Sequence, residues 1–136
     1  MSSDRREIRF PEADALALQL SAGRTAAGAV FLALPVLSAR LLGADSATAK
    51  RVSWLTRMMA VRDTAIGAGG VAALRGKGSA TPWLIAGAVS DTVDAIVLTQ
   101  ALQQGRVKGF IPAAVVPLAA GAAAVGALTA FRLRRG

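Results

Sequence analysis

Charged side chains interrupt two long apolar stretches of this sequence. Arg62 and Asp63 lie within one stretch, and Asp91 and Asp94 lie within the next. A spacing of three residues places Asp91 and Asp94 on one face of a helix. Carboxylates and guanidinium groups in such positions can form an ion-pair network, hold a proton, or line a path for an ion or a polar solute.

Three residue types that often take part in catalysis are missing from the sequence. It has no Cys, no His and no Tyr, which excludes disulfides, thiol chemistry and a Ser nucleophile activated by His. We therefore predict a non-enzymatic protein with no catalytic residues, no cofactor and no metal. A single weak magnesium site on Asp91 and Asp94 stays open as an alternative.

The composition is typical of a membrane protein. Of the 136 residues, 54% are hydrophobic and only 4% are aromatic, and the mean hydropathy is +0.49. The excess comes from Ala, Val, Leu and Gly, which are small or aliphatic residues that let helices approach closely in lipid. We expect one membrane domain over residues 1–136.

The net charge of +8 could indicate a nucleic-acid partner or an anionic membrane surface. The Lys and Arg residues fall in short clusters between apolar stretches, without interleaved aromatic residues. This pattern lacks the basic stripe and the motifs of nucleic-acid readers. We predict that the protein contacts the lipid bilayer and its anionic headgroups and binds no nucleic acid.

Four apolar segments are predicted to cross the membrane, each with about the 20 residues that a spanning helix needs. The expected fold is all-α, an integral membrane four-helix bundle with a polar tail over residues 1–15. The spans are expected at about 16–42, 52–74, 81–102 and 109–131. The last span is the clearest because it contains no charged residue, whereas Pro35 is expected to bend the first.

The Lys and Arg residues outside or at the ends of these spans predict the orientation. Eight lie on the side of the termini: Arg5, Arg6, Arg9, Arg75, Lys77, Arg132, Arg134 and Arg135. Five lie on the opposite side: Arg40, Lys50, Arg51, Arg106 and Lys108. Because the side richer in basic residues faces the cytoplasm, both termini are predicted to be cytoplasmic, with the reverse orientation as the alternative.

The three aspartates are expected at one depth in the membrane. In a hairpin that turns at Gly78, Asp63 lies 15 residues before the turn, and Asp91 and Asp94 lie 13 and 16 residues after it. Each unpaired charge at the centre of a membrane helix costs about 2.5 to 3.5 kcal/mol, so these side chains are predicted to face inward and pair. The predicted network comprises Arg57, Arg62, Asp63, Asp91 and Asp94. Arg24 is expected to lie too near the inner surface to join it.

Two arginines facing three aspartates leave one carboxylate without a cation. That group is predicted to be protonated, since burial and a neighbouring like charge both disfavour its ionised form. Asp94 is the candidate proton site. The network can therefore be structural, joining two helices, or functional, carrying protons, ions or a solute.

Small residues in the two charged spans predict close helix packing. Gly67 and Gly70 are expected to pack in the second span, with Gly87 of the third span as the surface opposite them. Trp54 and Trp83 are expected at opposite ends of the hairpin, where Trp residues anchor helices at the membrane interface.

Two segments carry a likeness to known sequences. Residues 57–67 read Arg-Met-Met-Ala-Val-Arg-Asp-Thr-Ala-Ile-Gly, and residues 83–94 read Trp-Leu-Ile-Ala-Gly-Ala-Val-Ser-Asp-Thr-Val-Asp. They resemble a family of small four-span proteins of actinobacteria that is known only as a domain of unknown function. The resemblance implies a four-span topology and a bacterial plasma membrane, and it brings no activity. The sequence also resembles, more loosely, the DoxX-like membrane proteins. This likeness comes from Gly23-Arg24 and the small-residue helix that follows.

Two functions remain as predictions. The first is a homo-oligomer or an accessory subunit of a larger membrane complex, in which the charged residues form an internal polar network. The alternative is a proton-linked transporter or channel for a small polar solute, which requires a titrating aspartate.

Overall fold

The computed structural model describes residues 11–76 and 78–135, and within these ranges it is helical with no β-strand. Six helices follow one another: α1 (Pro11–Ala33), α2 (Pro35–Leu41), α3 (Ser46–Arg51), α4 (Ser53–Arg75), α5 (Thr81–Gln103) and α6 (Phe110–Arg135). The all-α prediction is confirmed. Residues 1–10 of the predicted polar tail lie outside the described ranges, and residues 11–15 are the first residues of α1.

Three of these helices are long and apolar enough to cross a membrane: Glu12–Ala33 within α1, the whole of α5 and the whole of α6. They indicate a membrane protein. Helix α4 is as long as α5, with 23 residues, but Arg57, Arg62 and Asp63 lower its hydropathy. Helix α4 is therefore not among the three helices of spanning hydropathy.

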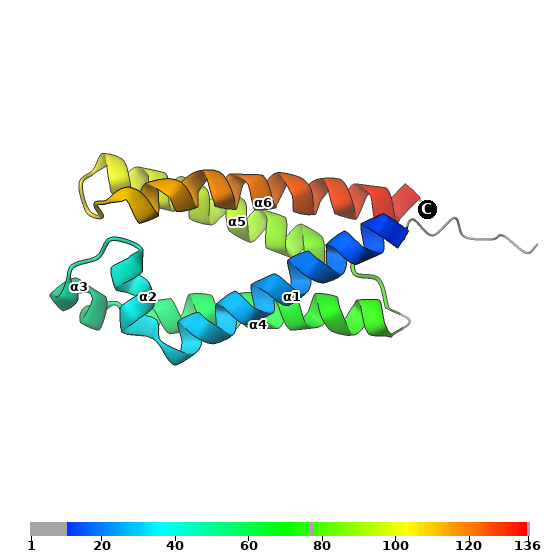
Figure 1. The fold of residues 1–136 in the computed structure, drawn as a ribbon, viewed down its shortest axis with the longest axis horizontal. Helices are drawn as coiled ribbons and strands as arrows, with labels where there is room; N and C mark the ends of the chain where they lie inside the picture. The colour runs from blue at the N-terminus through cyan, green and yellow to red at the C-terminus, as the bar shows by residue number, and fades with distance from the viewer. Residues whose placement is uncertain (1–10, 77, 136) are drawn as a thin grey trace, which may run out of the picture.

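Pro35 separates the first predicted span into two helices. Helix α1 ends at Ala33, and α2 begins at Pro35, because proline has no backbone N–H to continue the hydrogen-bond ladder and fits the first position of a new helix. The seven residues of α2 lead into the short helix α3 at the end of the molecule that also holds the loop between α5 and α6 (Figure 1).

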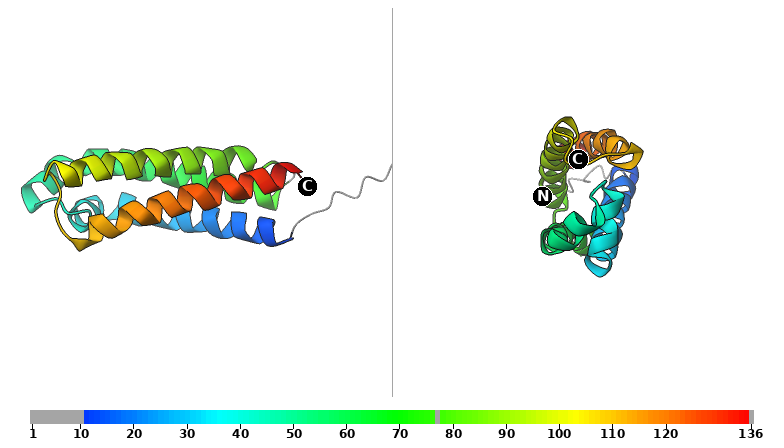
Figure 2. Two further views of the ribbon diagram at one scale, coloured as in Figure 1. Left: turned by 90° about the horizontal axis from the view of Figure 1, so that it is seen from above. Right: turned by 90° about the vertical axis from the view of Figure 1, so that its left-hand side faces the viewer.

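The four long helices form two pairs. Helix α1 packs along α4, and α5 packs along α6, whereas α4 with α5 and α1 with α6 make far fewer contacts. Figures 1 and 2 show the pairs as two layers. The beginning of α1, the turn between α4 and α5, and the end of α6 lie at the same end of the molecule (Figure 1).

Matching stripes of small residues explain the close contact between α1 and α4. A Cβ atom added to Gly67 would lie 2.6 Å from both the Ser21 carbonyl oxygen and the Thr25 nitrogen, and one added to Gly28 would lie 2.7 Å from the Thr64 nitrogen. The two backbones therefore touch where side chains are absent. The hydroxyls of Thr25 and Thr64 donate to carbonyls four residues earlier in their own helices, both at 2.8 Å, so neither is left without a partner in the interface.

This packing corrects the prediction for the glycines. Gly67 and Gly70 do lie in a helix interface, but the surface opposite them is α1, with Ser21 next to both. Gly87 does not oppose them. A Cβ atom on Gly87 would instead lie 3.1 Å from Nε of Arg24, so the third glycine makes room for a charged side chain.

The distribution of side chains is the reverse of that in a soluble protein. The buried residues are mostly small, including Ala17, Ala60 and Thr129, whereas Phe110 is 84% exposed and Leu118 is 70% exposed. Large apolar side chains on the outside cost nothing in lipid, and small residues inside allow helices to pack by van der Waals contact. The pattern agrees with three apolar helices of spanning length.

Helix α3, which lies between α2 and α4 in the chain, begins with a strong cap. Asp45 Oδ1 accepts hydrogen bonds from the Ala47 and Thr48 nitrogens at 2.9 and 3.0 Å, and Oδ2 accepts from the Thr48 hydroxyl at 2.6 Å. The Thr48 hydroxyl, followed by the backbone donors, lowers the pKa of Asp45 below its usual value, because each bond favours the ionised carboxylate.

We expect acid to weaken this cap. Because the pKa of Asp45 is lowered in the folded state, its contribution is present above the ordinary Asp pKa of about 3.9 and is lost as pH falls through the lowered value. In hydrogen exchange at neutral pH, Asp45→Ala should speed exchange of the α3 amides, while Asp45→Ser, which can still cap, should keep most of the protection. Equal exchange in the two variants would contradict this role.

Candidate functional site

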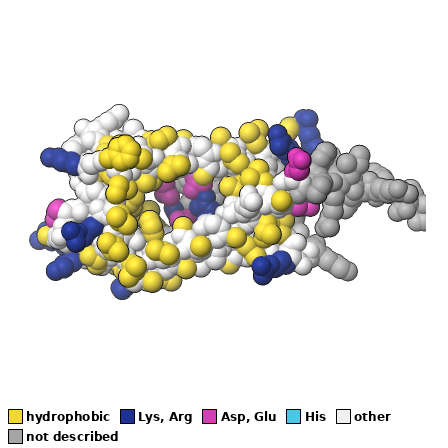
Figure 3. Space-filling model, viewed as in Figure 1, with side chains coloured by type: hydrophobic (Ala, Val, Ile, Leu, Met, Phe, Trp, Pro, Cys, Tyr) yellow, Lys and Arg dark blue, Asp and Glu magenta, His cyan; other side chains and the backbone are white. Residues whose placement is uncertain are grey.

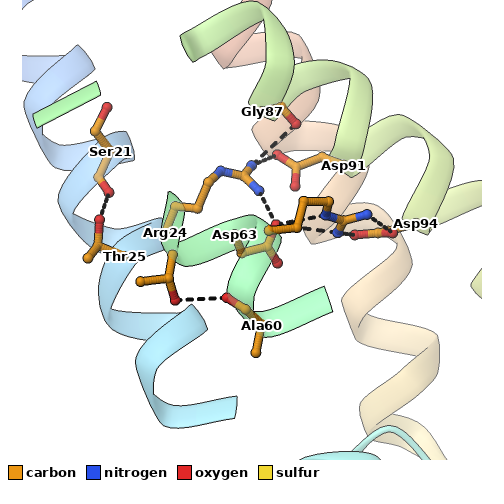
Figure 4. Close-up of polar contacts among 10 residues, drawn as sticks. Ser21, Arg24, Thr25, Ala60, Asp63, Gly87, Asp91 and Asp94 are labelled. Atoms are coloured by element: carbon orange, nitrogen blue, oxygen red, sulfur yellow. Dashed lines mark hydrogen bonds and ion pairs between the residues drawn. The ribbon is translucent and has the colours of Figure 1, made fainter. Parts of the chain in front are cut away.

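Five charged side chains meet between the two helix pairs, and we call this set the polar network (Figure 4). Its members are Arg24 of α1, Arg62 and Asp63 of α4, and Asp91 and Asp94 of α5. Each is placed by a long helix, and α6 contributes none of them. Figure 3 shows acidic and basic side chains inside a hollow between the pairs, surrounded by hydrophobic side chains.

Arg24 connects three helices. Its Nη1 donates to Asp63 Oδ1 at 3.1 Å, and its Nη2 donates to Asp91 Oδ2 and, at 3.3 Å, to the Gly87 carbonyl oxygen. The side chain is only 17% exposed. Its guanidinium therefore uses the fork of donors that suits arginine to carboxylate pairing, and the missing side chain of Gly87 opens the α5 backbone to it.

Arg62 forms the second half of the network. Its Nη2 and Nη1 donate to the two oxygens of Asp94 at 2.7 and 3.4 Å. Its Nε and Nη2 both lie 3.3 Å from Asp63 Oδ1, so this single oxygen accepts from both arginines. The side chains of Arg62 and Asp94 are 36% and 30% exposed, and this half is the more open one.

Four of the five predicted network residues come together: Arg62, Asp63, Asp91 and Asp94. Arg57 does not join them, because it is exposed and forms no ion pair within residues 11–76 and 78–135. It lies five residues before Arg62, which is about 7.5 Å along the helix, and the inner positions are filled by Arg24 and Arg62.

The prediction for Arg24 is wrong. It takes part in two ion pairs, because α1 begins at Pro11 and so carries Arg24 about 20 Å along the helix rather than near its start. Asp91 lies about 15 Å from the start of α5 by the same measure, at a similar level. The signal for Arg24 in the sequence is a lone charge between Ala15 and Ala39.

Beside the network lies a cleft of about 390 Å³, lined by residues from all four long helices. Arg24, Asp63 and Asp91 form its charged part, and Leu20, Leu84 and other apolar or small residues form most of its wall. Such a volume can hold a few water molecules or a small ligand.

The described residues contain no group of three or more Asp, Glu, His or Cys side chains that could hold a metal ion. Asp91 pairs with Arg24, and Asp94 pairs with Arg62.

The chain was compared with known proteins in three ways. No family model, curated protein or solved structure matches it. The function is therefore argued from the chemistry of the site, since a helical fold alone does not identify one.

Proposed function

We propose that this protein is a non-enzymatic, multi-pass protein of a bacterial plasma membrane, in which the polar network holds two helix pairs together. It is a four-helix bundle with both termini in the cytoplasm, and it acts as a homo-oligomer or as an accessory subunit of a membrane complex. The observation that carries the proposal is that every aspartate of the network is paired with an arginine of another helix.

The ion pairs lie where apolar packing is weakest. Few contacts connect α5 to α1 or α4, yet the Arg24–Asp91 and Arg62–Asp94 pairs both cross from one helix pair to the other. Lipid offers no hydrophobic drive to bring helices together, so polar bonds contribute to association and fix the register. This supports a structural role for the network.

Packing also supports α4 as a fourth crossing. Helix α4 runs beside α1, and the side chains of Arg62 and Asp63 are both paired within the polar network. Four crossings would put the beginning of α1 and the end of α6 on the same side of the membrane. This agrees with Figure 1, in which both lie at the same end of the molecule.

The fourth crossing can be tested with single cysteines, because the chain has none of its own. Ser46 at the start of α3 and Ser79 before α5 are both exposed. In intact cells, a membrane-impermeant maleimide should label Ser46→Cys, and it should label Ser79→Cys only after permeabilisation. Labelling of both from the same side would mean that α4 does not cross.

The structural role predicts the behaviour of Asp94→Asn. The change weakens the two bonds to Arg62 and should lower the free energy of unfolding in mild detergent by about 1 to 2 kcal/mol, since hydrogen bonds to a charged group in a partly exposed site are worth about that much. In proteoliposomes, neither the wild type nor the variant should take up small polar solutes in a manner that depends on a pH gradient. Uptake in the wild type that Asp94→Asn abolishes would overturn the structural proposal.

The cleft favours a second candidate, a proton-linked transporter or channel for a small polar solute. Asp63 and Asp91 line the cleft together with Arg24, and the network contains three carboxylates for two guanidinium groups. One excess acid beside an open cleft is an arrangement that can exchange a proton. The proteoliposome measurement separates this candidate from the first.

A further inference from the structure

The cleft has two chemically different ends. Arg24, Asp63 and Asp91 form the charged end, and Trp83 lines the other. Trp83 and Asp91 are eight residues apart on α5, which is about 12 Å along the helix. The wall between them is formed by residues such as Leu20 and Leu84, so the cleft suits a molecule with one polar end and one apolar end.

The charged end has unused acceptors. Arg24 and Arg62 bond Oδ1 of Asp63, and Arg24 bonds Oδ2 of Asp91. Within the described part of the chain, no hydrogen bond reaches Asp63 Oδ2 or Asp91 Oδ1. A carboxylate can accept about four hydrogen bonds, two at each oxygen, so both residues can take a further donor while their arginine bonds stay in place.

The net charge of the cleft selects the ligand. Because Arg62 also pairs with Asp63, the count is made over the whole polar network, which has three carboxylates for two guanidinium groups. This leaves one negative charge beside a mostly apolar cavity. An anion is repelled there, and a neutral molecule leaves the excess charge uncompensated. A monovalent cation compensates it, and the volume of about 390 Å³ lies in the lower part of the range for ligand pockets.

We propose that the cleft binds a small monovalent organic cation. An ammonium or guanidinium head donates hydrogen bonds to Asp63 and Asp91, and a short apolar tail lies along the α1 and α5 wall toward Trp83. This binding does not depend on transport, and it goes beyond the role of the network in holding the helix pairs together.

The natural fluorescence of Trp83 provides the measurement. The chain has two tryptophans, so Trp54→Phe in detergent or nanodiscs leaves only the one that lines the cleft. Titration with n-hexylammonium at pH 7 should change its emission in a saturable manner. Hexan-1-ol, which has the same tail and no charge, should give no saturable change, and hexyltrimethylammonium, which has the charge without donors, should bind about tenfold more weakly or worse. Equal responses to all three compounds would overturn the proposal.

Substitutions locate the site. Asp91→Asn should weaken hexylammonium binding about tenfold or more, whereas Asp94→Asn, which removes the same charge outside the cleft lining, should change it far less. Ala27→Leu keeps every charge and fills the cleft next to Arg24, one turn further along α1, at an exposed position, so it should also weaken binding even if Asp91→Asn does not fold. Equal losses in Asp91→Asn and Asp94→Asn, or unchanged binding in Ala27→Leu, would contradict a site in the cleft. Neither result would affect the structural proposal, which is tested by the free energy of unfolding.

Discussion

Replacing Arg24 with Met is expected to lower the free energy of unfolding by about 3 to 5 kcal/mol, which is the cost of removing one partner from a buried ion pair. The guanidinium is bonded to Asp63, Asp91 and the Gly87 carbonyl oxygen at the same time. Without it, Asp91 keeps no cationic partner among the described residues, and Asp63 keeps only Arg62. The loss can be measured by unfolding in mixed micelles of increasing denaturing detergent.

Arg57→Met is the matched control for this prediction. Arg57 also lies in a long helix, but it is exposed and forms no ion pair with the described residues, so its replacement should change stability by less than about 0.5 kcal/mol. Similar losses in the two variants would show that the chain needs its overall positive charge and not the pairing of Arg24.

Replacing Gly67 with Ala is expected to separate α1 from α4 and to cost about 3 kcal/mol or more, the upper end for overpacking. The new methyl group would lie 2.6 Å from the Ser21 carbonyl oxygen and the Thr25 nitrogen. These are backbone atoms, which cannot turn aside as a flexible side chain can. The effect can be followed by the same unfolding measurement and by the thermal midpoint in mild detergent.

Gly23→Ala provides the control within the same helix pair. Among the described residues, no atom outside the local turn of α1 lies within 4 Å of a Cβ at this position, so the change should be neutral or should stabilise α1 by up to about 1 kcal/mol through its better helix propensity. If Gly23→Ala destabilises the protein as much as Gly67→Ala, the close contact at Gly67 is not the cause.

The network aspartates could be predicted because local spacing determines their geometry. Asp91 and Asp94 lie on one face of α5 by helical periodicity, and the high cost of charge in an apolar stretch requires them to find arginines. Both do. Which arginines pair with them depends on where each helix begins and on how the helices pack. Neither can be read from the residues next to the aspartates in the sequence.

Arg24 and Arg57 show this limit. Both are single basic residues in apolar surroundings, and the sequence favours Arg57 because it is closer to Asp63. The structure pairs Asp63 with Arg24 instead, because α1 lies against α4 and begins five residues earlier than the predicted span.

The order of the helices in the chain also does not predict that α4 packs mainly on α1 rather than on α5. The short turn between α4 and α5 predicts a hairpin, but the ring of Trp83 lies against Gly69 and the polar network fills the space further along. The stripe Ser21, Thr25 and Gly28 has the same spacing of four and three as the stripe Ala60, Thr64 and Gly67. That repeat of small residues is the signal that predicts α1 against α4.

The structural role and the proposed cation site use the same residues in compatible ways. Arg24 occupies one oxygen each of Asp63 and Asp91, which holds α1, α4 and α5 together, and the other oxygens remain for a donor in the cleft. A ligand that binds there should also stabilise the bundle, because anything that binds only the folded state raises its stability.

The central claim is that ion pairs hold the two helix pairs together, and a double-mutant cycle between Arg24 and Asp91 tests it most directly. We predict that Arg24→Met and Asp91→Asn each destabilise the protein, and that the double variant loses less than the sum by at least about 1.5 kcal/mol, as expected for residues in direct contact. If the two losses add to within about 0.5 kcal/mol, the pair across the helices contributes nothing of its own, and the account is contradicted.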